Sequence, residues 1–155
     1  MKEINLTQNK VALVDDEDFK WLNKWKWHAK KEKNTFYARR KKNGKTILMH
    51  RVVMFPKDGS EIDHKYYNGL NNQKNNLRIC TKQQNIWNTQ PYANKSSKFK
   101  GVCWHKSTQK WQARISFNYE KTLIGFFKFE IDAAIAYNSK AKQFFGEYAY
   151  QNIID

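Results

Sequence analysis

Residues 61–85 carry signals for a strand, a loop and a second strand in close succession, and they read EIDHKYYNGLNNQKNNLRICTKQQN. The end of the first predicted strand delivers Asp63 and His64 together. An asparagine-rich loop with one glycine separates this strand from a second one predicted at Asn76 to Cys80. Two short strands so close in the sequence predict a hairpin.

A helix is predicted directly after this hairpin. Thr81 with Gln84 three residues later forms a capping-box pattern, which marks a helix start. Asn85 then lies in the first turns of the helix, close to the hairpin. We therefore expect Asp63 and Asn85 to converge.

The residue types in this segment suit phosphodiester hydrolysis. That reaction needs a nucleophilic water, a base that deprotonates it and positive charge at the phosphorane. His64 is a candidate base. The carboxylate of Asp63 and the amide oxygen of Asn85 are hard ligands of the kind that Mg²⁺ or Mn²⁺ prefers.

The charge distribution points to a polyanionic partner. The 155 residues include 29 Lys or Arg and 14 Asp or Glu, a formal net charge of +15. No acidic residue occurs between Asp63 and Glu120, and a second acid-free block spans residues 33–57. With 15 % aromatic residues, this balance favours nucleic acid, although charge alone also permits an anionic membrane surface. A single charge run is usually only a solvated face, but the asymmetry covers much of the chain.

Length and cysteine content exclude several classes of protein. The chain is long enough for one ordinary domain or two small ones, and too short for a large multi-layer enzyme. Cys80 and Cys103 do not form a CxxC pair, which excludes a disulfide framework and a four-cysteine zinc ribbon. The N-terminal residues lack a signal-peptide core and no apolar run is long enough to span a membrane, so we expect a cytoplasmic protein.

The chain is predicted to be α+β with two parts joined by a linker at 91–97, PYANKSS. The predicted elements of the first part are a strand at Lys10–Val14, a helix at Asp15–Trp25, and strands at Phe36–Lys42 and Thr46–Met54 around an Asn43-Gly44 turn. Its core is predicted to contain Trp21, Trp25 and Trp27.

The second part is predicted to be a three-stranded antiparallel sheet packed on one helix. Strands are expected at 98–105, 111–117 and 122–127. From Glu130 onward, residues recur at helical spacing and Gly146 follows as a C-cap; the recurring positions are Ile131, Ala134, Ile135, Asn138, Ala141 and Phe145. Arg114, Ser116 and His105 alternate away from the predicted core, which leaves a basic face open.

Residues from His50 to about Asn88 resemble the HNH endonucleases, in particular the branch of phage and intron homing enzymes with an N-terminal ββα-metal module. This resemblance implies Asp63 and Asn85 as metal ligands, His64 as general base, and Asn76 as the residue that orients the histidine. The last position of the signature is Asn rather than His, which that branch permits. Met49-His50-Arg51 also resembles such enzymes, and Arg51 and Arg78 are predicted to contact DNA.

Residues from Ser97 to about Asn152 resemble the plant Apetala-two/ethylene-response-factor DNA-binding domain, whose sheet enters the major groove. The motifs are KFKGVCWHKSTQKWQARI, IGFF and DAAIAYNSKAKQFFGEYAYQN. By this resemblance Val102, Trp104, Trp111 and Ala113 belong to the core. The predicted DNA contacts are Lys98, Lys100, His105, Lys106, Lys110, Arg114 and Ser116. Fewer arginines lie on this face than in plant members, which favours phosphate contacts by lysine.

The combined prediction is a metal-dependent endonuclease in which residues 1–90 cut and residues 98–155 hold double-stranded DNA. One active site per chain predicts a nick, and monomer and homodimer both stay open. A membrane partner and a small-molecule cofactor are not expected. A bacterial or phage-infected host cell follows from the resemblance. The alternatives are a non-catalytic DNA-binding regulator and an RNA-binding or structural protein.

Overall fold

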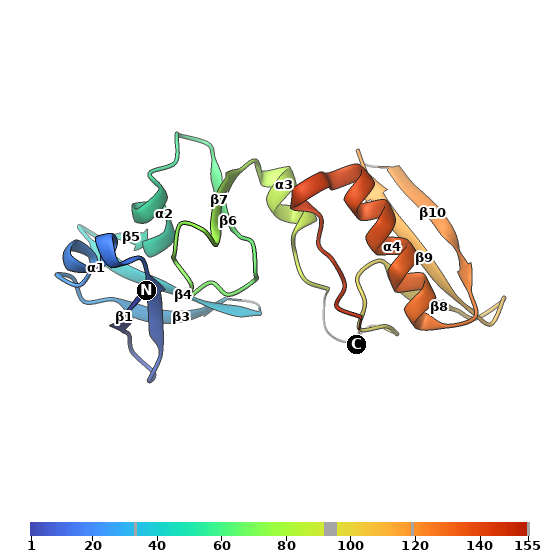
Figure 1. Cartoon of the computed structure of the whole chain (residues 1–155), viewed down its shortest axis with the longest axis horizontal. Helices are drawn as coiled ribbons and strands as arrows, with labels where there is room; N and C mark the ends of the chain where they lie inside the picture. The colour runs from blue at the N-terminus through green and yellow to red at the C-terminus, as the bar shows by residue number, and fades with distance from the viewer. Residues whose placement is uncertain (33, 92–95, 119, 155) are drawn as a thin grey trace. The chain divides into compact units, whose positions relative to one another are not determined.

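The computed structural model describes residues 1–32, 34–91, 96–118 and 120–154. The chain divides into two compact units, Met1–Asn85 and Ile86–Asp155 (Figure 1). The predicted linker at 91–97 follows this division, and its residues 92–95 lie outside the described residues. Small antiparallel sheets and helices of both units are compatible with the predicted α+β class.

The first unit is built from small antiparallel sheets. The two-stranded sheets are β1 (Lys2–Asn5) with β2 (Val11–Val14), and β6 (Glu61–His64) with β7 (Leu77–Cys80). The three-stranded sheet has the order β3 (His28–Glu32), β4 (Thr35–Lys42), β5 (Lys45–Leu48). The helices are α1 (Asp16–Leu22), α2 (Met49–Met54) and α3 (Lys82–Trp87), the last of which crosses the division between the units.

The β4–β5 hairpin confirms the predicted Asn43-Gly44 turn, but the strand predicted at Thr46–Met54 is wrong in its second half. Asn43 and Gly44 both have positive φ, 50° and 74°, as a tight hairpin turn requires. The strand ends at Leu48 and a helix begins at Met49. A short apolar run does not distinguish strand from helix, and here Met49 and Val53, one helical turn apart, both enter the core.

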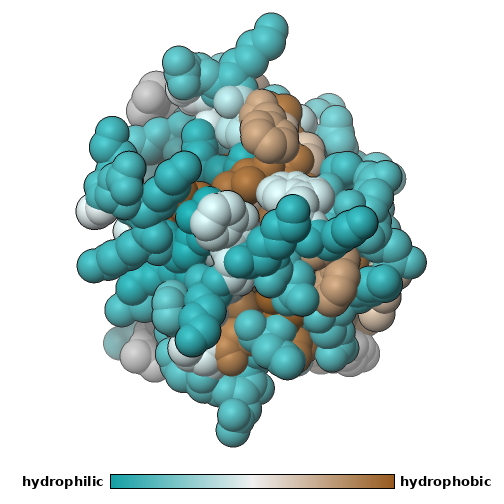
Figure 2. Space-filling view, turned by 90° about the vertical axis from the view of Figure 1, so that its left-hand side faces the viewer, coloured by the Kyte–Doolittle hydropathy of each residue, from teal (hydrophilic) through white to brown (hydrophobic). Residues whose placement is uncertain are grey.

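Trp27 is buried in the core of the first unit, and Trp21 packs against that core. Trp27 is 3 % exposed and its Nε1 donates to the Leu22 carbonyl over 2.9 Å. Trp25 is 48 % exposed, so its predicted place in the core is wrong; α1 ends at Leu22 and the Arg40 guanidinium covers the Trp25 ring instead. The face drawn in Figure 2 is mostly hydrophilic, with apolar patches between polar side chains.

The second unit confirms the predicted three-stranded sheet and helix, but its first strand begins at Val102 rather than Lys98, because residues 98–101 form bends and turns. The sheet has the order β10 (Glu120–Phe127), β9 (Lys110–Phe117), β8 (Val102–His105). Helix α4 (Glu130–Phe145) packs on this sheet and is followed by the short 3-10 helix η1 (Gly146–Tyr148). No helix in the described part of the chain is long and apolar enough to cross a membrane.

Small side chains form the contact between α4 and the sheet. Ala133 and Ala134 are fully buried and lie in one cluster with Val102 and Ala113. The predicted inner face of the helix is therefore partly wrong, because Ile131 and Ile135 are 44 % and 51 % exposed. Trp104, also predicted in the core, is 41 % exposed and meets the Trp111 ring edge-on at the end of the strand pair.

We expect Gly101→Ala to destabilise the second unit by about 3 kcal/mol, measured by urea denaturation. Gly101 has φ +77°, and an added Cβ would overlap the Tyr137 ring. Gly59→Ala is the matched control, because Gly59 has φ +79° with nothing within 4 Å of an added Cβ. That variant should lose only roughly 1 kcal/mol of stability, because the added Cβ strains the backbone but meets no neighbour. Equal losses in the two variants would contradict the close approach of Tyr137.

Candidate active site on the β6–β7 strand pair and helix α3

Asp63 and His64 are consecutive residues of β6 and are each 6 % exposed. Because successive strand residues point to opposite faces, the two side chains have different surroundings. The Asp63 carboxylate meets Arg78 on β7, whereas the His64 ring packs against Tyr37 and His50. The predicted metal ligand and the predicted base therefore lie on opposite sides of one strand.

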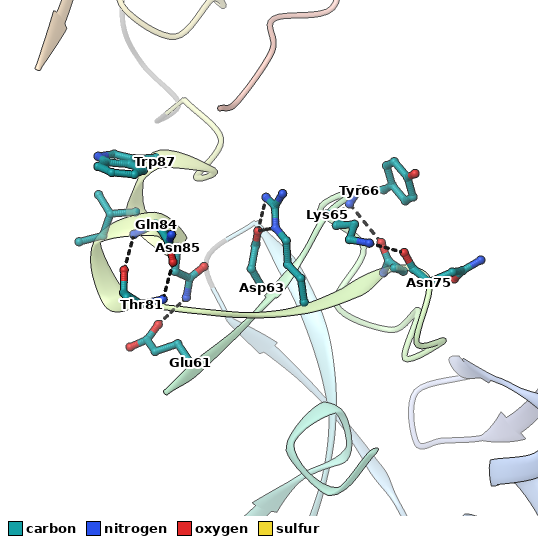
Figure 3. A network of polar contacts seen from close by, with 12 residues as sticks. Glu61, Asp63, Lys65, Tyr66, Asn75, Thr81, Gln84, Asn85 and Trp87 are labelled. Atoms are coloured by element: carbon teal, nitrogen blue, oxygen red, sulfur yellow. Dashed lines mark hydrogen bonds and ion pairs between the residues drawn. The ribbon is translucent and has the colours of Figure 1, made fainter. Parts of the chain in front are cut away.

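Arg78 is the partner of Asp63. The two residues face each other in the β6–β7 register, and Arg78 Nε and Nη2 donate to Asp63 Oδ2 over 2.8 and 2.6 Å (Figure 3). Their side chains are only 10 % and 7 % exposed, respectively. The predicted DNA contact of Arg78 does not fit this geometry, because the guanidinium is nearly buried and bound to a carboxylate.

His64 lies in an aromatic pocket that keeps its imidazole neutral at neutral pH. Its ring centroid is 5.0 Å from that of His50 and 5.5 Å from that of Tyr37, both edge-on. Burial lowers the pKa of His64 to about 4, although Asp63 and a side-chain hydrogen bond with Asn72 raise it in part. A neutral imidazole is the state that a general base needs.

His50 completes this pocket. It is 7 % exposed, and burial with the neighbouring His64 lowers its pKa to about 3. Arg51 is exposed and donates to the Ser60 carbonyl at 3.3 Å, so it ties down the turn before β6. His50 thus points inward from α2, and Arg51 lies at the surface.

Asn85 is held by Glu61. The predicted capping box is confirmed, since Thr81 N donates to Gln84 Oε1 and Gln84 N donates to Thr81 Oγ1. On the helix that starts there, Asn85 Nδ2 donates to Glu61 Oε2 (Figure 3). This contact turns the amide oxygen of Asn85 away from the Glu61 carboxylate. Figure 3 shows Asp63 and Asn85 along the same strand pair, each with its own partner.

Asn76 is fully buried and closes the loop after His64. Its Oδ1 accepts from Tyr66 N at 3.1 Å, its carbonyl accepts from Lys65 N at 2.9 Å, and its Nδ2 donates to the Asn71 carbonyl at 2.7 Å. The predicted role of Asn76 is to orient His64. These bonds suggest a route for that role through the backbone that directly follows the histidine.

Four predicted DNA contacts of the second unit lie on the side of the sheet away from α4, namely His105, Lys110, Arg114 and Ser116. Arg114 and Ser116 are exposed on β9, and His105 on β8 stacks edge-on against Phe126. Arg114 Nη2 also donates to Cys103 Sγ over 3.2 Å. Lys98, Lys106 and Lys110 are exposed.

Lys100 has a different place from the one predicted. Its Nζ donates to the carbonyls of Trp87 and Thr89, both at 2.7 Å, at the end of α3. Burial lowers its pKa to about 8. A lysine that is committed to carbonyls in this way does not fit the predicted DNA contact, because its hydrogens are used inside the unit.

Sequence reasoning missed the neighbours of the predicted site. The sequence pattern could have identified Glu61, because it lies two residues before Asp63 and so on the same face of the strand. Tyr37 and Asn72 carried no local signal, since they meet His64 only through the tertiary fold.

The oxygen donors available for a metal are few. Among the described residues, no group of three or more His, Cys, Asp or Glu side chains could hold a metal ion. The segment does supply one carboxylate from Asp63 and one amide oxygen from Asn85, and these are hard ligands. Such a pair suits a hydrated Mg²⁺ or Mn²⁺ that takes further oxygens from a phosphate.

Comparison with known proteins gives two viral relatives. The chain is 33 % identical over 149 residues to an uncharacterized HNH endonuclease of Acanthamoeba polyphaga mimivirus, covering 93 % of this chain and 75 % of that protein. It is also 33 % identical over 58 residues to Protein 3.8 of Escherichia phage T7, covering 37 % of this chain and 48 % of that protein. No family model and no solved structure matches.

The longer match has to include residues 61–85, because it leaves only a small part of the chain uncovered. The segment with the predicted signature is therefore within the shared region, together with most of both units. At this identity and coverage, the chain belongs to the HNH endonuclease family.

Proposed function

We propose that this protein is a metal-dependent endonuclease that nicks double-stranded DNA, with the cutting site in the first unit and a DNA-binding sheet in the second. The observation that carries the proposal is the β6–β7–α3 segment, which holds a carboxylate, an imidazole and an amide in fixed positions within an HNH family member. One such segment per chain supports a nick rather than a concerted double-strand break.

His64 is the proposed general base. It would accept the proton of the attacking water at an imidazole nitrogen, and its neutral state at physiological pH supports this role. The rings of His50 and Tyr37 pack edge-on against His64 and hold its ring in place. Asn76 would contribute indirectly, by holding the backbone after His64.

Asp63 and Asn85 are the proposed metal ligands. A bound Mg²⁺ or Mn²⁺ would supply the positive charge that stabilises the phosphorane and the leaving oxygen. Glu61 would position Asn85 by accepting its Nδ2, so that the amide oxygen faces the ligand site. Arg78 would hold the Asp63 carboxylate in one orientation.

The sheet of the second unit is the proposed site for groove binding. Its face opposite α4 combines the exposed Arg114 and Ser116 with two exposed apolar residues, Leu123 and Phe126. Arginine can read guanine or contact phosphate, and apolar groups can meet thymine methyl groups. The Apetala-two/ethylene-response-factor resemblance supports this assignment.

One observation favours the alternative of a non-catalytic DNA-binding regulator. The Arg78 guanidinium already occupies Asp63 Oδ2 with two hydrogen bonds. In that alternative the Asp63–Arg78 pair is purely structural and no metal binds there. Nicking and metal binding distinguish the two functions.

His64→Ala should lower nicking by about 10²- to 10⁴-fold while DNA affinity stays unchanged, because the base is removed and no surface cation is lost. The assay is conversion of supercoiled plasmid to nicked circles with Mg²⁺ or Mn²⁺, with EDTA as the blank. His64→Gln is the control for packing, since it fills more of the pocket but cannot act as the base. Full activity in either variant would contradict the assigned role.

Asn85→Ala should weaken Mn²⁺ binding at least about tenfold, measured by titration calorimetry on the full chain. Gln83→Ala, which removes an exposed amide from the same helix, is the matched control and should leave Mn²⁺ affinity unchanged. Equal Mn²⁺ affinity in the two variants would contradict the assignment of Asn85 as a metal ligand.

Arg114→Ala should lower DNA affinity or relax the preference among duplex sequences, by about 1–3 kcal/mol if the guanidinium reads a base. Lys142→Ala is the matched control, because Lys142 is an exposed cation on α4, which packs on the other side of the sheet. Fluorescence anisotropy with a panel of duplexes measures both. Identical behaviour of the two variants would argue against a DNA-reading sheet.

A further inference from the structure

The β3–β4–β5 sheet of the first unit has two faces with different neighbours. One face packs on the core through Ala38, with Ile47 beside it. We call the other the open face; its register positions are His28, Lys30 and Glu32 on β3, Thr35, Tyr37, Arg39 and Lys41 on β4, and Thr46 and Leu48 on β5. His28, Lys30 and Lys41 are exposed and Arg39 is half-buried.

The open face leads directly to the candidate active site. Tyr37 belongs to this face, and its ring lies edge-on to both His50 and His64 at 5.6 and 5.5 Å. The loop at Gly69 covers the face at Thr35 and Tyr37, so the exposed part begins beyond Tyr37. Arg39 and Lys41 follow Tyr37 on the same side of β4. At the usual rise of a strand they lie about 7 and about 14 Å further along, and 14 Å is the axial length of about four base pairs.

The lysine and arginine side chains of this face form no ion pair among the described residues. These side chains are Lys30, Arg39 and Lys41, whereas the cations of the described ion pairs are the N-terminus, Lys74 and Arg78. Arg40, on the core-facing side of the same strand, differs, because its guanidinium stacks over Trp25 and Trp27. Arg40 therefore packs inside the unit, whereas the neighbouring Arg39 belongs to the open face.

The charge of the open face selects a polyanion as the partner. Its acidic residue is Glu32, at the end of β3, whereas its cations are Lys30 on β3 and Arg39 and Lys41 on β4. Residues 34–57, within the part of the chain that the structure describes, contain no acidic side chain at all. A flat basic face beside a phosphodiester-cleaving site matches the charge of a duplex backbone.

We propose that the open face binds the phosphate backbone of the duplex beside the scissile phosphate, with Arg39 and Lys41 as the contacts next to His64. The position of the scissile phosphate rests on the proposed function, but the binding surface itself does not. This surface belongs to the first unit and is additional to the sheet of the second unit.

The test compares two double variants of the full chain with the same change of charge. Arg39→Gln with Lys41→Gln removes the open-face cations, and Lys31→Gln with Lys42→Gln removes two exposed cations from the opposite face of the same strands. Affinity for a fluorescein-labelled duplex is measured in EDTA over a series of KCl concentrations. Circular dichroism melting checks that all the variants fold.

The open-face variant should bind at least about tenfold more weakly. Its negative slope of log K against log salt should become shallower by about 1.8, or about 0.9 for each lost phosphate contact. The control variant should keep the wild-type slope. Equal losses in both variants would mean that only net charge matters, and no loss in either would mean that DNA lies elsewhere. Both results would overturn the proposal.

Nicking in Mg²⁺ separates this proposal from the proposed function. If the wild-type chain binds DNA but does not nick it, the endonuclease assignment fails while the binding comparison still decides the surface. If the chain nicks, the open-face variant should raise KM at least about tenfold and retain most of kcat, since the lost contacts are made equally in substrate and transition state. An unchanged KM would count against the surface.

Discussion

The buried side chain of Asn76 holds the loop on which the rest of the candidate site depends. A fully buried amide is costly unless its hydrogen bonds are made, and Asn76 makes them with the backbone on both sides of the loop, at Tyr66 and at Asn71. The same loop pairs with β2, where Leu13 N donates to the Leu70 carbonyl and Asn72 N donates to the Leu13 carbonyl. Because the loop is tied at both places, β6 and β7 meet in a single register, which places Asp63 opposite Arg78 and His64 against Tyr37.

The site consists of polar groups that are already paired. Breaking a nearly buried ion pair such as Asp63–Arg78 leaves an uncompensated charge, so the pair holds its geometry even where it adds little net stability. Glu61 does the same for the amide of Asn85. His64 differs, because its surroundings are mainly rings that desolvate it. The segment therefore offers a carboxylate and a neutral imidazole on opposite sides of one strand, and this separation supports the proposed division between metal binding and proton transfer.

In two sheets of the chain, side chains that alternate along the strands give the sheet one core-facing side and one outer side. In each, one face packs on a hydrophobic core, at Ala38 in the first unit and Ala113 in the second. The other face carries cations, Arg39 and Lys41 in the first unit and Arg114 in the second. Phosphate neutralisation acts additively over such contacts and depends strongly on salt, so in the proposed function each unit would contribute separately to DNA affinity.

The residue order alone was sufficient for features whose cause is local. The Asn43-Gly44 turn, the Thr81–Gln84 capping box, the short strands around the asparagine-rich loop and the three strands before α4 depend on neighbouring residues, so the pattern predicted them. Resemblance to the HNH family likewise rested on short-range spacing. The tertiary structure decided everything that needs a distant partner: that residues 49–54 form a helix, that Trp25 and Ile135 lie at the surface, and that Arg78 and Lys100 turn inward. The physical reason is that an apolar or charged side chain has no intrinsic preference between two faces, and only the opposing element determines whether that side chain is buried, paired or left exposed.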